Sequence, residues 1–109
     1  MRFTVAAVVA LCASPAFGGF EDGNKLLSKC EGDPVLRENC YGYIIGISDT
    51  MAGNAINGFR ACFPIGVSKV QIFAVTTTYL KDHPENRGYG AAGLVAAALA
   101  DAFPCQDSQ

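Results

Sequence analysis

Histidine occurs once in the 109 residues of this sequence, at His83, and its scarcity excludes most kinds of catalytic site. Nucleophilic catalysis by serine or cysteine needs a base beside the nucleophile, and a zinc site needs several ligands at a regular spacing. The glycines form no phosphate-binding or dinucleotide-binding pattern. Any two of the ten acidic residues could converge as a carboxylate pair, but the sequence singles out none. We therefore predict no catalytic residue, no metal site and no cofactor. His83 stands between Asp82 and Pro84, which indicates a turn or helix-cap role.

Basic charge is also sparse, because eight Lys and Arg stand against ten Asp and Glu. The basic residues are scattered and form no stripe with interleaved aromatic residues, so nucleic acid is not a predicted partner. The sequence contains no internal repeat and no low-complexity tract, and no apolar run of membrane length follows the N-terminal segment. It predicts one domain that has no membrane partner once the N-terminal segment is removed.

The first eighteen residues have the pattern of a secretory signal peptide. A short positive start precedes an apolar run, residues 3–13, that is too short for a permanent membrane anchor. Small residues at the expected positions predict cleavage before Gly19, with cleavage before Phe17 as the alternative. Cleavage removes Cys12 and leaves residues 19–109 as the exported domain, with four cysteines.

Caps and breakers divide the exported domain into four helices, the first of them short. A helix start is indicated by Asp33 followed by Pro34, another by the capping box of Ser68 and Gln71, and a helix end by Pro84. The predicted helices cover about residues 25–30, 34–55, 69–83 and 85–103, with Arg87 as an alternative start of the last. The predicted fold is therefore all-α, a small four-helix bundle stapled by disulfides.

Helical spacing also predicts which side chains face the core. On the second helix, Tyr43 falls on the apolar face and Tyr41 points outward. On the third helix, the predicted inward row is Val70, Phe73, Ala74, Thr77 and Leu80. On the fourth helix, the predicted inward row is Ala91, Ala92, Val95, Ala98, Leu99, Ala102 and Phe103.

The four remaining cysteines can pair in three ways on spacing alone. A short turn joins the third and fourth helices, so we expect these helices to be antiparallel, with the start of one beside the end of the other. Cys62 and Cys105 lie just outside those two ends, and Cys30 and Cys40 flank the first turn. We predict the disulfides Cys30–Cys40 and Cys62–Cys105, which contribute roughly 2.5 and 4 kcal/mol through loop closure. This pairing leaves no free thiolate in the exported domain.

Several short motifs follow one another along the exported domain. They are residues 40–49 (CYGYIIGISD), residues 62–64 (CFP), Gln71, residues 79–85 (YLKDHPE), the pairs 94–95 and 98–99, and residues 102–105 (AFPC). This ordered combination resembles the Rap/Tai family of periplasmic immunity proteins, which protect bacteria against type VI secretion amidases that cut peptidoglycan. The resemblance implies a helical, disulfide-bonded periplasmic protein that binds and occludes a cysteine amidase effector, often as a homodimer. The sequence departs from the family pattern at residues 53–58 and 88–90.

The loop of residues 53–60 is the candidate contact surface, because a stapled helical frame can present a glycine-rich loop with little ordering entropy. Its candidate partner-binding residues are Asn54, Asn57, Phe59 and Arg60. Phe59 offers an apolar anchor and Arg60 a charged donor, although Phe59 could instead pack under the Cys62 bridge. The turn of residues 82–87 is the next candidate. A second class of function also stays open, a periplasmic structural or chaperone-like helical protein with no dedicated target.

Overall fold

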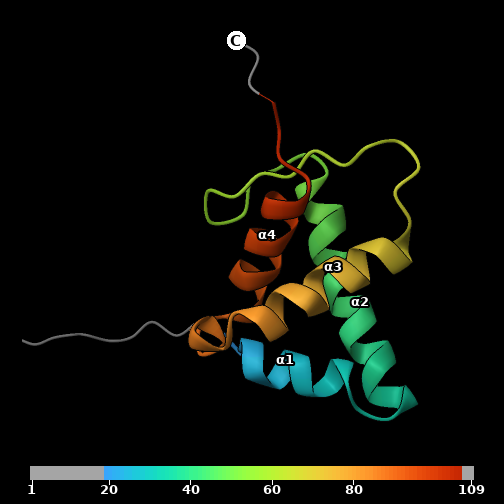
Figure 1. The fold of residues 1–109 in the computed structure, drawn as a ribbon, viewed down its shortest axis with the longest axis vertical. Coiled ribbons are helices and arrows are strands. Elements are labelled where there is room, and N and C mark those ends of the chain that lie inside the picture. Colours follow the sequence, from blue (N-terminus) through green and yellow to red (C-terminus); the bar gives the residue numbers. More distant parts are fainter. Residues whose placement is uncertain (1–18, 107–109) are drawn as a thin grey trace, which may run out of the picture.

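Side-chain caps begin three of the four α-helices in residues 19–106, the part of the chain that this computed structural model describes (Figure 1). The backbone N–H of Lys25 donates to Asp22 at the start of α1 (Gly23–Cys30), and that of Leu36 donates to Asp33 at the start of α2 (Pro34–Met51). The predicted capping box begins α3 (Lys69–Asp82). A 3₁₀ turn, η1 (Pro84–Asn86), follows α3, and α4 (Ala91–Ala102) begins after Gly90 without a side-chain cap. The predicted signal peptide and its cleavage site lie outside the described residues.

The helices pack around α2, which contacts α1, α3 and α4. Figure 1 shows α1 near the lower end of α2, α3 crossing obliquely in front of α2, and α4 to the left of the upper part of α2. The buried side chains form one apolar core with members from all four helices, and they include Leu26, Ile44, Met51, Leu80, Val95 and Leu99. The all-α prediction is therefore confirmed. No helix in the described residues is both long enough and apolar enough to cross a membrane.

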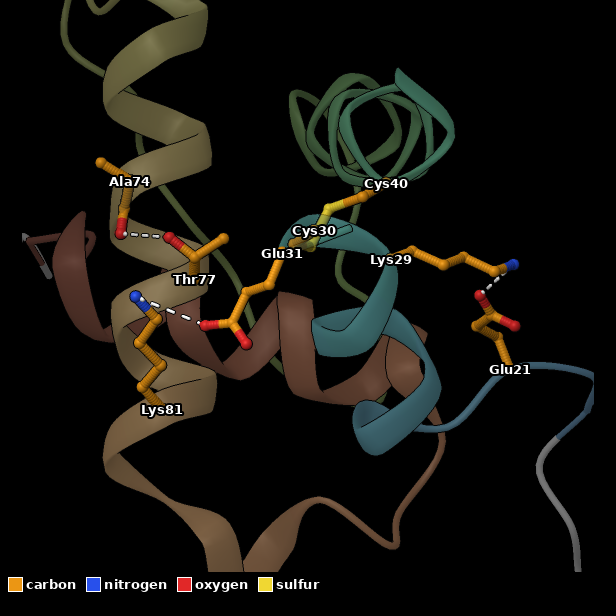
Figure 2. The surroundings of a disulfide bond; sticks show 8 residues. All are labelled: Glu21, Lys29, Cys30, Glu31, Cys40, Ala74, Thr77 and Lys81. Carbon is orange, nitrogen blue, oxygen red and sulfur yellow. Dashed lines mark hydrogen bonds and ion pairs between the residues drawn. A yellow bond between two sulfur atoms is a disulfide. The ribbon is translucent and has the colours of Figure 1, made fainter. Parts of the chain in front are cut away.

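Both predicted disulfides are present, Cys30–Cys40 and Cys62–Cys105. Figure 2 shows that Cys30–Cys40 joins the end of α1 to α2. Two ion pairs flank this junction: Glu21 with Lys29 at 2.8 Å, and Glu31 with Lys81 of α3 at 3.6 Å. Both residues of the second pair are more than half exposed, so this pair adds little to stability.

Two predicted helix ends are wrong. We expected the second helix to reach about Ala55, but α2 ends at Met51. The side-chain amide of Asn54 donates to the carbonyl oxygen of Thr50 and so caps the end of α2. We expected the last helix to begin at Glu85 or Arg87, but α4 begins at Ala91.

The late start of α4 has a tertiary cause. The segment before α4 pairs by backbone hydrogen bonds with the start of the described chain: Gly23 N–H donates to Tyr89, Asn24 N–H to Arg87, and Ala91 N–H to Glu21. Carbonyl groups engaged in this pairing are unavailable to an α-helix ladder. Long-range pairing therefore overrides helix propensity here, and sequence spacing carries no signal of it.

Two predictions about side-chain direction are also wrong. The inward row of α3 is Ile72, Thr76 and Leu80, whereas Val70 of the predicted row is 69% exposed. Both rows share Leu80, so helical spacing alone fits either, and packing against the neighbouring helices decides between them. Tyr41, predicted to point outward, is half-buried because its ring meets the edge of Phe73 of α3, with ring centroids 5.1 Å apart. Tyr43 is half-buried, in line with the predicted inward direction.

The fourth helix is buried on more sides than predicted. Leu94 and Ala96 are buried in addition to most of the predicted row, whereas Ala102 is exposed. The small side chains of α4 allow this, because neighbouring backbone can approach closely on several sides. This burial makes α4 the central support of the surface described below.

Replacing Thr76 with valine should raise the free energy of unfolding by about 1 kcal/mol. The Thr76 side chain is fully buried, and its hydroxyl has no hydrogen-bond partner among the described residues. Valine has nearly the same shape, so the variant removes an unsatisfied hydroxyl without opening a cavity. Tm should rise by about 4–8 °C in a thermal melt. Thr78→Val is the matched control, because Thr78 is exposed on the same helix and its replacement should change Tm little. Destabilisation by Thr76→Val would show that the hydroxyl is satisfied in solution.

Candidate functional site

The candidate loop contains a tight two-residue hairpin. Ile56 and Phe59 exchange both of their backbone hydrogen bonds, at N–O distances of 3.0 and 2.8 Å. Between them, Asn57 and Gly58 have positive φ angles of 52° and 82°, the combination of a type I′ turn. Asparagine and glycine adopt this backbone with the least strain. The sequence therefore fixes this part of the loop in one shape, which we call the hairpin (residues 56–59).

Two sets of contacts hold the loop against α4. In the first turn of the helix, a Cβ atom built on Gly93 would lie 2.7 Å from the side-chain nitrogen of Asn57, so the absence of a side chain at Gly93 makes room for Asn57. At the end of the helix, the N–H of Cys62 donates to the carbonyl oxygen of Phe103 at 2.8 Å. The rings of Phe63 and Phe103 lie 5.4 Å apart, and the Cys62–Cys105 disulfide closes the same junction. Figure 1 shows the connection from α2 to α3 passing over this end of α4.

An open cavity of about 630 Å³ lies beside the hairpin, and we call it the aromatic cavity. Alanine and glycine residues of α4 contribute to its wall, and the hairpin and the segment before α4 contribute other parts. Its aromatic lining residues come from five separate segments and are Phe20, Tyr43, Phe59, Tyr79 and Tyr89. Three of these rings are exposed: Phe20 by 98%, Tyr89 by 68% and Phe59 by 40%. Exposed aromatic side chains gathered around one hollow are typical of a binding surface.

The cavity lining carries little charge. Glu21 is its one charged lining residue, and its carboxylate is paired with Lys29. Burial raises the pKa of Tyr43, and the negative charge of Glu21 raises it further. A tyrosine with its ordinary pKa is already protonated at neutral pH, and the raised pKa of Tyr43 preserves its hydroxyl proton to higher pH. With the side chains of Asn57 and Asn86, the cavity offers apolar contact area together with a few hydrogen-bonding groups.

The described residues that line the cavity include no serine, cysteine or histidine. They therefore assemble no serine or cysteine nucleophile with a histidine base. Residues 19–106 contain no group of three side chains placed to hold a metal ion. His83 lies outside the cavity, at the end of α3, where its Nδ1 donates to the carbonyl oxygen of Tyr79 and its ring stacks on the Tyr79 ring at 4.0 Å. This is the cap role that the sequence predicts.

The structure separates the four predicted partner-binding residues into two pairs. Asn57 and Phe59 line the aromatic cavity. Asn54 and Arg60 line a different hollow of about 360 Å³, which also includes Cys62. Phe59 lines the aromatic cavity and does not line that second hollow.

Sequence reasoning missed most of the aromatic lining. Phe20, Tyr43, Tyr79 and Tyr89 are distant in sequence, and no spacing rule brings them together. Of these four, Tyr89 stands out in the sequence, because it lies between two glycines in the stretch that departs from the family pattern. In the other candidate segment, residues 82–87, Arg87 is engaged internally: its guanidinium donates to the carbonyl oxygen of Leu80 and to the side chain of Asn24.

A disulfide-bonded helical body that holds a hairpin beside an exposed aromatic cavity has the features of a small binding protein. A sequence model described as Rap1a immunity proteins matches residues 22–105, which is most of the chain. The protein belongs to the Rap1a immunity protein family. No curated protein and no solved structure shows a significant match to it.

Proposed function

We propose that this protein acts in the periplasm and inhibits a type VI secretion amidase that cuts peptidoglycan, by binding the amidase and covering its active-site cleft. The observation that carries the proposal is the family match over residues 22–105, since an immunity protein has a toxin effector as its partner. The signal-peptide pattern of the first eighteen residues supports export. The disulfides support an oxidising compartment, because such bonds are rare in the cytosol.

The hairpin and the aromatic cavity are the proposed contact surface for the effector. A type I′ turn braced on α4 loses little conformational freedom when it enters a cleft, so most of its contact energy is available for binding. Phe59 and Tyr89 present large apolar rings beside it, and aromatic residues contribute a large share of the energy in many interfaces. Asn54 and Arg60 line the other hollow, so they would contact the effector only if its contact area extended beyond the aromatic cavity to that hollow.

Phe59→Ala should weaken effector binding by at least tenfold, which corresponds to about 1.4 kcal/mol or more. The ring is 40% exposed, so its removal should lower Tm by only a few degrees. Arg60→Ala is the matched control, since Arg60 is the next residue but lines the other hollow, and it should weaken binding less. Binding would be measured by calorimetry with a peptidoglycan amidase encoded beside the immunity gene, together with inhibition of peptidoglycan cleavage.

The outcomes separate the alternatives. A larger loss from Arg60→Ala would move the contact surface to the hollow that contains Asn54. If neither variant weakens a confirmed complex, residues 82–87 become the candidate surface. Failure of every amidase from the same genome to bind the wild-type protein would contradict the proposal and favour a structural or chaperone-like role. Light scattering on the complex would also test the homodimer that the family resemblance implies.

A further inference from the structure

The two disulfides differ sharply in their exposure to solvent. Cys30 and Cys40 are 4% and 0% exposed and belong to the apolar core. Cys62 is exposed and Cys105 is half-buried, at the edge of the molecule. A reducing thiolate must reach a sulfur atom to attack it, so exposure decides which bridge reacts first. The outer bridge, Cys62–Cys105, should therefore open well before the inner bridge, Cys30–Cys40.

The two bridges also hold different parts of the protein. The inner bridge joins α1 to α2 inside the core. The outer bridge joins two segments that are not helical, the connection after α2 and the tail beyond α4. The connection carries Ile56, Asn57 and Phe59, all of which line the aromatic cavity.

Apolar packing also holds this connection, because Ala61 is buried in the core and Ile56 packs against it. Near the outer bridge, the N–H of Cys62 donates to Phe103, and the Phe63 ring contacts the Phe103 ring. Farther along, Asn57 packs over Gly93. Once the bridge is open, the chain between α2 and α3 regains conformational freedom that these contacts must then oppose alone. The hairpin side of the cavity therefore depends on the outer bridge.

We propose that Cys62–Cys105 is a redox-sensitive latch: its reduction releases the hairpin from α4 and opens the aromatic cavity, while the helical body, held by Cys30–Cys40, stays folded. The consequence for binding rests on the proposed function. An oxidised chain presents the complete contact surface, and a reduced chain does not. Inhibition of the effector is then confined to the compartment in which the bridge forms.

The reaction is thiol–disulfide exchange with a dithiol. A thiolate of the dithiol attacks the sulfur of Cys62, the more exposed residue of the bridge, forms a mixed disulfide and displaces the thiolate of Cys105, which takes up a proton. The second thiol of the reagent then attacks the mixed disulfide and releases the Cys62 thiolate, which is protonated in turn. Two electrons pass to the protein, and the dithiol becomes a cyclic disulfide. In the compartment to which the protein is exported, an oxidant that carries a disulfide reverses the same steps.

The first experiment maps the order of reduction in the mature protein without any effector. The protein is exposed to increasing dithiothreitol for short times, trapped with N-ethylmaleimide and analysed by peptide mass spectrometry. We expect Cys62 and Cys105 to be alkylated at least tenfold faster than Cys30 and Cys40. Equal rates, or earlier alkylation of the inner pair, would overturn the latch.

The second experiment asks what reduction releases. Hydrogen exchange is compared between oxidised protein and protein alkylated at the outer pair, with Cys62→Ser/Cys105→Ser as a variant that needs no reductant. The amides of Ile56 and Phe59 should exchange at least tenfold faster than in the oxidised protein, whereas amides of α1 and the centre of α2 should stay protected and exchange more slowly than those of the hairpin. Unchanged hairpin protection contradicts the proposal. So does loss of helical circular dichroism in step with alkylation of the outer pair alone, because the body is then not independent of the bridge.

The last arm uses the amidase. Reduction of the outer bridge should weaken its binding at least tenfold, and reoxidation should restore the affinity. Unchanged affinity with a released hairpin would overturn the role of the latch in binding. An amidase that binds neither oxidation state would overturn the proposed function, while the exchange experiments still decide whether the latch exists.

Discussion

Replacing Leu99 with alanine should lower the free energy of unfolding by about 3–5 kcal/mol, a large part of the total stability of a domain of this size. Leu99 is fully buried on α4, the helix with the most extensively buried surface. It belongs to the apolar core, and close-packed core residues relax only partly into the space left by a lost isobutyl group. Urea unfolding followed by circular dichroism would measure the loss, and Tm should fall by more than about 10 °C.

Leu36→Ala is the matched control for this prediction. It removes the same atoms, but Leu36 is 41% exposed at the start of α2, so the loss should stay near or below about 1 kcal/mol. Equal losses for the two variants would contradict the deep burial of Leu99 in the core. Leu99→Ala also tests the support of the candidate site, because α4 forms part of the wall of the aromatic cavity.

The starts of α2 and α3 could be predicted from the sequence because short-range chemistry determines them. Asp33 before Pro34 and the Ser68–Gln71 capping box satisfy backbone groups within four residues, so the signal is complete in a short window. The disulfide pairing was predicted from the expected order of the helices, and both predicted bridges are present. The hairpin residues Asn57 and Gly58 likewise indicate a turn.

The remaining features depend on contacts between distant residues. The helix α4 begins at Ala91, later than predicted, because the preceding segment pairs with the start of the described chain. The inward row of α3 was fixed by packing, since Phe73 meets Tyr41 of α2 while Ile72 enters the core. The aromatic cavity is the extreme case. Its five aromatic rings come from five segments, and only the loop that carries Phe59 could be chosen from sequence.

Removing the inner disulfide by Cys30→Ala/Cys40→Ala should cost about 4 kcal/mol, close to the cost of removing the outer disulfide. Loop closure alone favours the outer bridge, because its cysteines are 43 residues apart and those of the inner bridge are 10 apart. These separations give roughly 4 and 2.5 kcal/mol. Burial raises the cost of removing the inner bridge instead, because its cysteines lie in the core. Loss of two fully buried sulfur atoms adds about 1 kcal/mol each through lost contacts and the small cavity left behind, whereas the outer sulfurs lose little.

Urea unfolding of the two double-alanine variants measures both costs, with no free cysteine to form new disulfides at either site. We expect the two losses to agree within about 1 kcal/mol, and hydrogen exchange to separate them by location. The inner variant should lose protection in α1 and the start of α2, which Figure 2 shows meeting at Cys30 and Cys40. The outer variant should lose protection in the hairpin. An inner variant about 1.5 kcal/mol more stable than the outer one would mean that loop length alone determines what each bridge contributes, and that the core closes without penalty around the missing sulfur atoms.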